Sequence, residues 1–119
     1  MLLSWAWVPV NTNWLRSDEG IQQIVRDKIP DIIRAQSEMA FTRVLEIEEY
    51  KKHLDKKLDE EIKEYRTDHN LEELADILEV IYALCKADGH TIEELHALRK
   101  KKCDERGGFD DRIFLIGKE

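Results

Sequence analysis

Apolar residues in the middle of the chain recur every three to four positions, the spacing that places them on one face of an α-helix. Between residues 47 and 66 they occupy positions 47, 50, 54, 58, 62 and 65, which predicts one long helix. A second helix is predicted over residues 71–87, with Asn70 as its N-cap and Gly89 as its stop. The polar break between the two helices spans only residues 67–70. A loop this short joins antiparallel neighbours, so the pattern predicts a helical hairpin.

The flanking segments predict shorter elements. Pro30 suits the first turn of a helix, which is predicted over residues 31–37, and residues 40–45 are expected to be extended. Residues 112–116 (RIFLI) have strand character. The apolar residues 1–10 (MLLSWAWVPV) predict a short strand that pairs with them, a docked arm, or an extension foreign to the domain. The expected fold is all-α, with marginal strands at the termini.

The last predicted helix opens at a capping box formed by Thr91 and Glu94 and runs to Arg106, where two glycines interrupt it. A basic run at residues 99–102 lies close to its end. Cations at a helix C-terminus complement the helix dipole, which is the ordinary explanation of such a run. The alternative is that these cations, with Arg112 folded back across the glycines, bind phosphate.

Composition narrows the class of protein. A chain of 119 residues forms one domain with a single core. The net charge of −7 argues against a nucleic-acid polymer as the main partner. Cys85 and Cys103 show neither metal-type spacing nor a disulfide framework, which fits a reducing, cytoplasmic setting. The apolar N-terminal segment is far too short to span a bilayer, so no membrane partner is expected.

Four acidic residues stand where the two helices of the hairpin should be apolar. Glu61 and Glu64 lie three apart on the first helix, and Glu73 and Asp76 lie three apart on the second, so each pair shares a helix face. Glu61 falls inside the apolar stripe and Glu64 at its edge, whereas Glu60 points roughly to the opposite side. An unpaired buried carboxylate costs several kcal/mol or takes up a proton. Four carboxylates that face one another need a counter-charge, and a divalent cation is the simplest one.

A solvated acidic face is the competing interpretation. Charged residues make up 38% of the chain, and in such chains most acidic helices carry exposed i,i+4 pairs and bind nothing. The second acidic pair favours the metal site, because it interrupts a helix that is otherwise apolar nearly all round. Even so, spacing and expected burial alone do not favour the metal site over the solvated acidic face.

Three segments of the sequence resemble one enzyme superfamily. EEIKE at 60–64 and ELAD at 73–76 resemble the E-E-x-x-E … E-x-x-D signature of the all-α NTP pyrophosphatases, the superfamily of MazG, dimeric dUTPases and phosphoribosyl-ATP pyrophosphohydrolase. VRDKIPDII at 25–33 and KKCDERGGFDDRIFL at 101–115 resemble its small MazG-related, house-cleaning branch in order and spacing. The resemblance covers residues 21–117, which form the expected MazG-like helical domain. Residues 1–20 depart from it as an N-terminal extension or docked arm.

The resemblance implies a metal site and a set of catalytic residues. Mg²⁺, with Mn²⁺ as a substitute, would be coordinated by four carboxylates: Glu61, Glu64, Glu73 and Asp76. Glu60 would be a general base or a group that supports the ligands, and Glu61 would belong to the catalytic set. Cations would offset the charge of the leaving pyrophosphate, and those that match are Lys28, Lys102, Arg106 and Arg112, with Lys102 and Arg106 also counted as catalytic.

The reaction implied is the Mg²⁺-dependent hydrolysis of a nucleoside triphosphate to the monophosphate and pyrophosphate, which clears non-standard or excess nucleotides. Family members are homodimers or dimers of dimers whose four-helix-type bundles combine helices of two chains. The helix at 71–87 also has apolar residues on two opposite sides, which a short monomer cannot cover. Two alternatives stay open: a phosphoribosyl-ATP pyrophosphohydrolase, and a non-enzymatic acidic dimerisation module that holds a structural cation.

Overall fold

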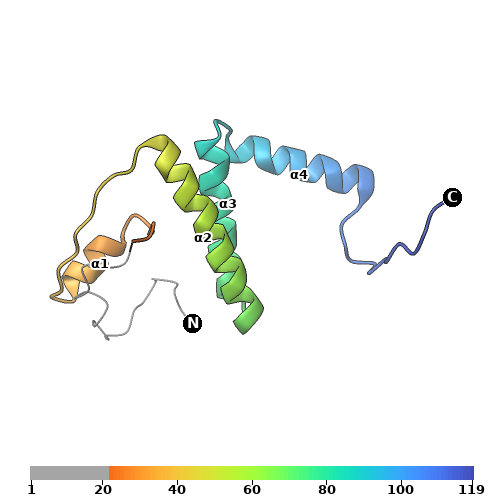
Figure 1. The fold of residues 1–119 in the computed structure, drawn as a ribbon. Coiled ribbons are helices and arrows are strands. Elements are labelled where there is room, and N and C mark those ends of the chain that lie inside the picture. Colours follow the sequence, from red (N-terminus) through yellow and green to blue (C-terminus); the bar gives the residue numbers. More distant parts are fainter. Residues whose placement is uncertain (1–21) are drawn as a thin grey trace.

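The computed structural model describes residues 22–119, and within this range the chain forms helices without strands (Figure 1). The expectation of an all-α fold is therefore confirmed for the described part of the chain. The helices, in chain order, are α1 (Ile29–Ala35), α2 (Ile47–Asp68), α3 (Leu71–Ala87) and α4 (Ile92–Arg106).

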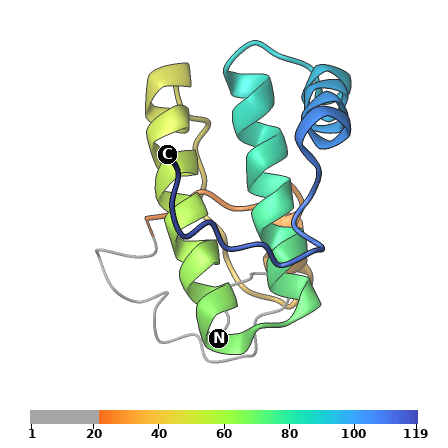
Figure 2. The same cartoon turned by 90° about the vertical axis from the view of Figure 1, so that its right-hand side faces the viewer.

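The centre of the molecule is the antiparallel hairpin of α2 and α3, which lie side by side along their length (Figure 2). His69 ends α2 in the left-handed conformation, with φ 50°, and its N–H donates to the carbonyl of Tyr65 at 2.7 Å. Asn70 then caps α3, because its side-chain oxygen accepts a hydrogen bond from the N–H of Glu73 at 3.0 Å. Two residues thus reverse the chain, and the predicted hairpin is confirmed.

The short helix α1 begins two residues earlier than predicted. Ile29 and Pro30 form its first turn, and Ile29 is 3% exposed, so an apolar contact anchors this turn. The helix ends before Ser37, whose positive φ of 63° is incompatible with continuation. Residues 40–45 follow without regular secondary structure and lead to α2.

The helix α4 begins at the predicted capping box. The hydroxyl of Thr91 accepts from the N–H of Glu94 at 3.0 Å, and the Glu94 carboxylate accepts from the N–H of Thr91 at 2.8 Å. Tyr82 on α3 and His96 on α4 tie the two helices together through a 3.1 Å hydrogen bond and an edge-on ring contact. From this junction α4 leads away from the hairpin (Figure 1).

The predicted strand at residues 112–116 is wrong. This segment has no regular secondary structure, and its side chains are exposed, with Ile113 at 84% and Ile116 at 93%. A strand must satisfy its backbone N–H and C=O groups on a neighbouring strand, and no described segment pairs with this one. Its expected partner, residues 1–10, lies outside the described residues, as do the predicted extension and docked arm.

Few apolar side chains of the described chain are buried. They are Ile29, Leu54 and Val80, at 3%, 4% and 8% exposure. By contrast, α3 carries an exposed apolar stripe with a spacing of three, four and three residues, formed by Leu71, Leu74, Leu78 and Ile81. A single chain therefore covers one side of α3 and leaves the other open. None of the described helices is both long enough and apolar enough to cross a membrane.

Candidate metal centre

The acidic residues of the hairpin meet in two overlapping groups. Carboxylate oxygens of Glu61, Glu73 and Asp76 lie within 4.8 Å of one another, and so do those of Glu64, Asp68 and Glu73. Glu73 belongs to both groups and joins them. The predicted convergence of four carboxylates is thus seen in part: Glu61, Glu73 and Asp76 share one group, and Glu64 is connected to it through Glu73. The metal-binding role stays a prediction.

Asp68 was not singled out in the sequence. It is the last residue of α2 and lies one helical turn beyond Glu64, so the two carboxylates share a face. The i,i+4 spacing of Glu64 and Asp68 could have indicated this residue. The sequence analysis did not use it, because the helix was predicted to end at residue 66, two residues before its observed end.

The core of this cluster is withdrawn from solvent. Glu61 is 1% exposed and Glu73 5%. Three buried oxygens have no hydrogen-bond partner in the described structure: Oε1 of Glu61, Oε1 of Glu73 and Oδ2 of Asp76. A buried acceptor without a partner forfeits its hydration, and a charged one forfeits more. Three such atoms in one place indicate a site that is completed by protons or by a cation.

Burial also changes the acidity of the two innermost residues. Burial raises the pKa of Glu61 to about 7, with the negative charges of Asp76 and Glu64 acting in the same direction and Lys57 acting against them. The pKa of Glu73 is raised as well, first by burial and then by the neighbouring charges of Glu64 and Asp76. Burial therefore favours the protonated forms of Glu61 and Glu73.

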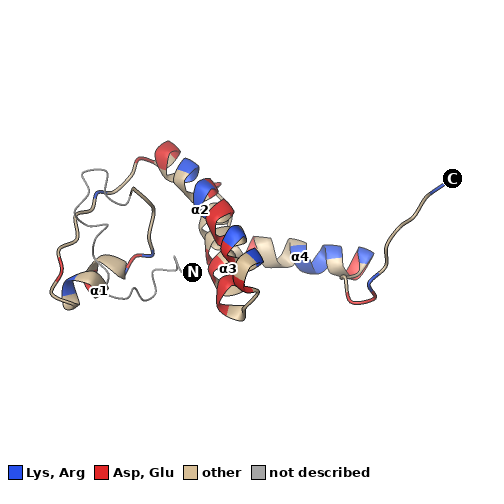
Figure 3. Ribbon diagram, turned by 60° about the horizontal axis from the view of Figure 1, so that its bottom comes forward, with Lys and Arg blue, Asp and Glu red and all other residues tan. Residues whose placement is uncertain are grey.

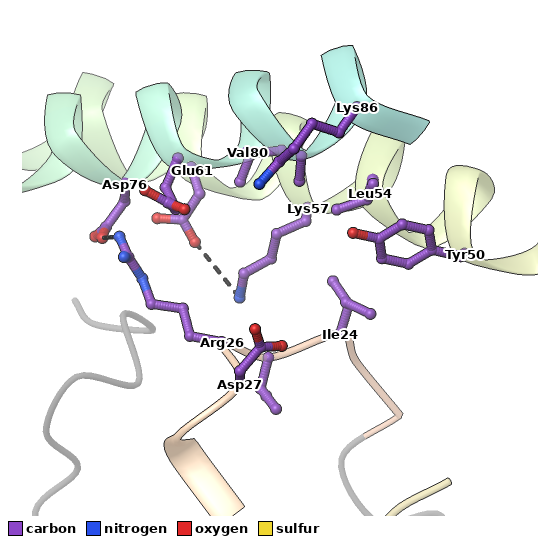
Figure 4. A pocket seen from close by; sticks show the side chains of 13 residues that line it. Ile24, Arg26, Asp27, Tyr50, Leu54, Lys57, Glu61, Asp76, Val80 and Lys86 are labelled. Carbon is purple, nitrogen blue, oxygen red and sulfur yellow. Dashed lines mark hydrogen bonds and ion pairs between the residues drawn. The ribbon is translucent and has the colours of Figure 1, made fainter. Parts of the chain in front are cut away.

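Among the residues that the structure describes, Lys57 and Arg26 form ion pairs with carboxylates of the cluster (Figure 4). The ammonium of Lys57, on α2 one turn before Glu61, lies 3.4 Å from Oε2 of that carboxylate. The guanidinium of Arg26 donates to Oδ1 of Asp76 at 2.6 Å. Each cation pairs with one carboxylate oxygen and leaves the other oxygen of the same group without a partner. Hard oxygen donors with unsatisfied lone pairs fit Mg²⁺ or Mn²⁺, so the residues present suit the implied cofactor.

Glu60 stands apart from both groups. Its side chain is 38% exposed and lies 4.0 Å from the ammonium of Lys57, which in turn contacts Glu61. This placement agrees with the helical wheel, which directed Glu60 away from the apolar stripe. Glu60 is connected to the carboxylates through Lys57 and does not converge with them.

A pocket of about 250 Å³ adjoins the cluster. Asp76 and Glu61 lie at one end of the pocket, and Tyr50 and Leu54 at the other (Figure 4). Residues 24–27 form the wall opposite the hairpin. The pocket thus has a charged end, at Asp76 and Glu61, and a more apolar end, at Tyr50 and Leu54.

The four cations expected to bind phosphate are exposed and do not line the pocket beside the carboxylates. Lys102, Arg106 and Arg112 lie on or beyond α4, are exposed, and lead away from the hairpin with that helix (Figure 3). Lys28 precedes α1 and is exposed, and it is not part of the pocket wall. Within one chain the structure does not bring these four cations to the pocket, and their role stays a prediction.

The two cations at the site were missed by the sequence analysis. Lys57 lies four residues before Glu61, so helical spacing could have found it. Arg26 belongs to the VRDKIPDII segment of the resemblance, but it stands outside any helix and fifty residues before Asp76, so no spacing rule connected the two.

Comparisons with known proteins do not assign this chain to a family. No family model matches it, and no solved structure matches it. An uncharacterised protein of Mycolicibacterium smegmatis is 50% identical over 44 residues, which are 37% of this chain and 45% of that protein. The chain therefore matches less than half the length of this relative.

Proposed function

We propose that this protein is a Mg²⁺-dependent nucleoside triphosphate pyrophosphohydrolase of the MazG-like type. The observation that carries the proposal is the buried meeting of the two acidic pairs, with three carboxylate oxygens that lack partners. The resemblance of three segments in order and spacing supports the same conclusion. A solvated acidic face, the competing interpretation, does not account for Glu61 at 1% exposure.

Glu61, Glu64, Glu73 and Asp76 would hold the cation, all from the rigid hairpin. Bound Mg²⁺ supplies charge neutralisation for phosphate oxygens and lowers the pKa of a coordinated water. The remaining catalytic work falls to the chain itself. The helices fix the carboxylates in advance, so little reorganisation accompanies binding. Lys57 holds the Glu61 carboxylate in position at 3.4 Å.

The reaction breaks the bond between the α-phosphorus and the oxygen that bridges it to the β-phosphorus. A water oxygen forms the new bond to the α-phosphorus, and pyrophosphate leaves with the bridging oxygen. The water proton passes to an acidic side chain, for which the resemblance gives Glu60; its contact with Lys57 also lets it position that ammonium. The nucleoside would enter the pocket toward Tyr50 and Leu54.

The proposal includes a homo-oligomer, a homodimer or a dimer of dimers. The exposed stripe of α3 recurs with the three-four spacing of helix–helix interfaces, and a second copy of the hairpin would cover it. In an oligomer α4 of one chain can approach the carboxylates of another, which the role of Lys102, Arg106 and Arg112 requires. Sedimentation at micromolar concentration should show a particle of at least twice 14.1 kDa. A 14 kDa particle would refute the oligomer.

The activity is tested by incubating the protein with a panel of triphosphates and with phosphoribosyl-ATP, with Mg²⁺ and with EDTA. We expect equal amounts of monophosphate and pyrophosphate, and no products in EDTA. Hydrolysis of phosphoribosyl-ATP alone would transfer the proposal to that enzyme class. No hydrolysis of any compound, together with tight binding of Mn²⁺, would instead support the dimerisation module with a structural cation.

A further inference from the structure

Residues 22–28 cross in front of the hairpin without forming a helix or a strand. Two side-chain contacts connect this segment to the cluster. The guanidinium of Arg26 donates to Oδ1 of Asp76 at 2.6 Å, and the ammonium of Lys57 donates to the side-chain oxygen of Gln23 at 3.4 Å. Figure 4 shows the Arg26 side chain extending from its backbone to Asp76, at the end of the pocket that Glu61 also lines.

The position of Arg26 at the cluster is unusual for a structural ion pair. Its side chain is 50% exposed, while that of Asp76 is only 14% exposed. The guanidinium therefore sits between solvent and the buried carboxylates. It donates to Oδ1 of Asp76. Oδ2 of Asp76, Oε1 of Glu61 and Oε1 of Glu73 stay without a hydrogen-bond partner. A group that served only to neutralise the cluster would be expected to reach these atoms as well.

We propose that Arg26 is an exchangeable counter-ion: it pairs with Asp76 when the site is metal-free, releases this carboxylate to an incoming divalent cation, and then binds the phosphate oxygens of the substrate. The first half concerns the protein and the cation alone. The second half rests on the proposed triphosphate hydrolysis and names a phosphate-binding residue for it.

Three physical properties of the contact favour exchange. The guanidinium of Arg26 is half-exposed, so water can solvate it when it leaves Asp76, which lowers the cost of breaking the ion pair. The backbone carbonyl of Arg26 accepts a hydrogen bond from the N–H of Ile29 at 3.0 Å in the turn before α1, so the exchange requires a movement of the side chain alone and breaks no backbone hydrogen bond. A guanidinium is charged at every relevant pH, and its planar array of donors matches two oxygens of a phosphate as well as it matches a carboxylate.

The other cations of the pocket wall are less suited to this role. Lys57 is on a rigid helix, only 12% exposed, and is engaged by both Glu61 and Gln23. Lys86 is an exposed residue in the last turn of α3, ten residues or about 15 Å of helix beyond Asp76. Arg26 is therefore the cation that can both block Asp76 and remain close to a ligand bound there.

The first experiment measures binding of Mn²⁺ alone to the full chain, by electron paramagnetic resonance or calorimetry. Arg26→Ala removes the competitor of the metal, so the Kd for Mn²⁺ should fall by about two- to tenfold. The matched control is Arg43→Ala, which breaks the ion pair of Arg43 with Glu49 at 2.6 Å on the surface of α2. This control should leave the Kd unchanged. Weaker Mn²⁺ binding by Arg26→Ala would overturn the proposal, because it would assign Arg26 a structural role.

The second experiment measures triphosphate hydrolysis at saturating Mg²⁺. Arg26→Ala should raise KM by about ten- to a hundredfold, since a charge-assisted phosphate contact is lost, and Arg26→Lys should lie between it and the wild type. A lower Kd for Mn²⁺ together with a higher KM for the triphosphate is the result that exchange predicts. Equal KM values for Arg26→Ala and Arg43→Ala would overturn the phosphate-binding half. Should the alanine variant fail to fold, Arg26→Gln, which removes the charge and keeps the length, takes its place in both experiments.

The two experiments also separate this inference from the proposed function. If the wild-type protein hydrolyses no triphosphate, the proposed function fails and the phosphate-binding half falls with it. The Mn²⁺ measurement still decides whether Arg26 competes with the metal. If hydrolysis is observed and Arg26→Ala changes neither Kd nor KM, the proposed function stands and the inference is refuted.

Discussion

The acidic hairpin and the basic end of α4 each carry a run of like charges (Figure 3). The two runs differ in burial: acidic side chains of the hairpin are buried, whereas no residue of α4 is. In the hairpin, Glu61 and Glu73 are buried and face other carboxylates. In α4 no residue is buried, and the charges pair locally, as Lys100 does with Asp104 at 3.0 Å over one helical turn. Both segments suggested a binding site from their sequence. Of the two, the hairpin brings its charged side chains together within the described chain.

The difference shows what makes a charge run informative. Exposed i,i+4 pairs are stabilised by water and by the helix itself, so they require no ligand. Carboxylates withdrawn from water have lost their hydration, and in the hairpin Lys57 and Arg26 each pair with only one carboxylate oxygen. The hairpin is therefore the region where a substitution should change chemistry most, while α4 should respond only if it reaches a site on another chain.

The largest expected effect is that of Asp76→Ala. We expect turnover to fall by at least about a hundredfold, since an electrostatic group of the site is lost. The metal-free protein should keep nearly wild-type stability, because the loss of the ion pair with Arg26 is offset by the removal of one of several mutually repelling charges. The matched control is Asp104→Ala on α4, which should retain full turnover. Near wild-type turnover of Asp76→Ala at saturating Mg²⁺ would contradict the assigned role.

The second effect concerns the stability of the metal-free protein as a function of pH. The pKa of Glu61 is about 7 in the folded chain, above the 4.5 of an ordinary glutamate, because burial disfavours its charge. Between these values the folded state binds more protons than the unfolded state, so stability falls as pH rises. The expected loss between pH 4.5 and 8 is up to about 3 kcal/mol, and the raised pKa of Glu73 acts in the same direction.

Urea unfolding in EDTA at several pH values measures this slope, with Glu61→Gln as the variant. Glutamine has the same size and cannot titrate, so its stability should vary less across the range. A parallel pH dependence in both proteins would show that Glu61 is not the responsible group. Lys100→Gln on the exposed surface of α4 should keep the wild-type slope.

The smallest effect tests whether α4 contributes to the site at all. If Arg106 binds phosphate across an oligomer interface, Arg106→Ala should lower kcat/KM by about ten- to a hundredfold, since a charge-assisted contact is lost. Its melting temperature should stay nearly unchanged, because Arg106 is an exposed residue at the end of a helix. Unchanged kinetics with a slightly lowered melting temperature would instead identify a cation that only complements the helix dipole.

Local rules account for the elements that the sequence predicted well. The bounds of α3 agree with the prediction at residues 71–87, because Asn70 caps one end and Gly89, at φ 91°, stops the other. The capping box at Thr91 was likewise predicted from two residues three apart. The meeting of the acidic pairs followed from the same kind of reasoning, since helical period and a short turn determine which faces of a hairpin oppose each other.

What the tertiary structure decided depends on contacts between distant segments. The pairing of Arg26 with Asp76 spans fifty residues and depends on the path of the chain before α2, for which no spacing rule exists. The direction of α4 follows from its contact at Tyr82 and His96, and the segment at 112–116 is no strand because no described segment pairs with it. Helical spacing and capping act over one or two turns and are written in consecutive residues. Ion pairs, strand pairing and burial are decided by whichever segments the fold brings together.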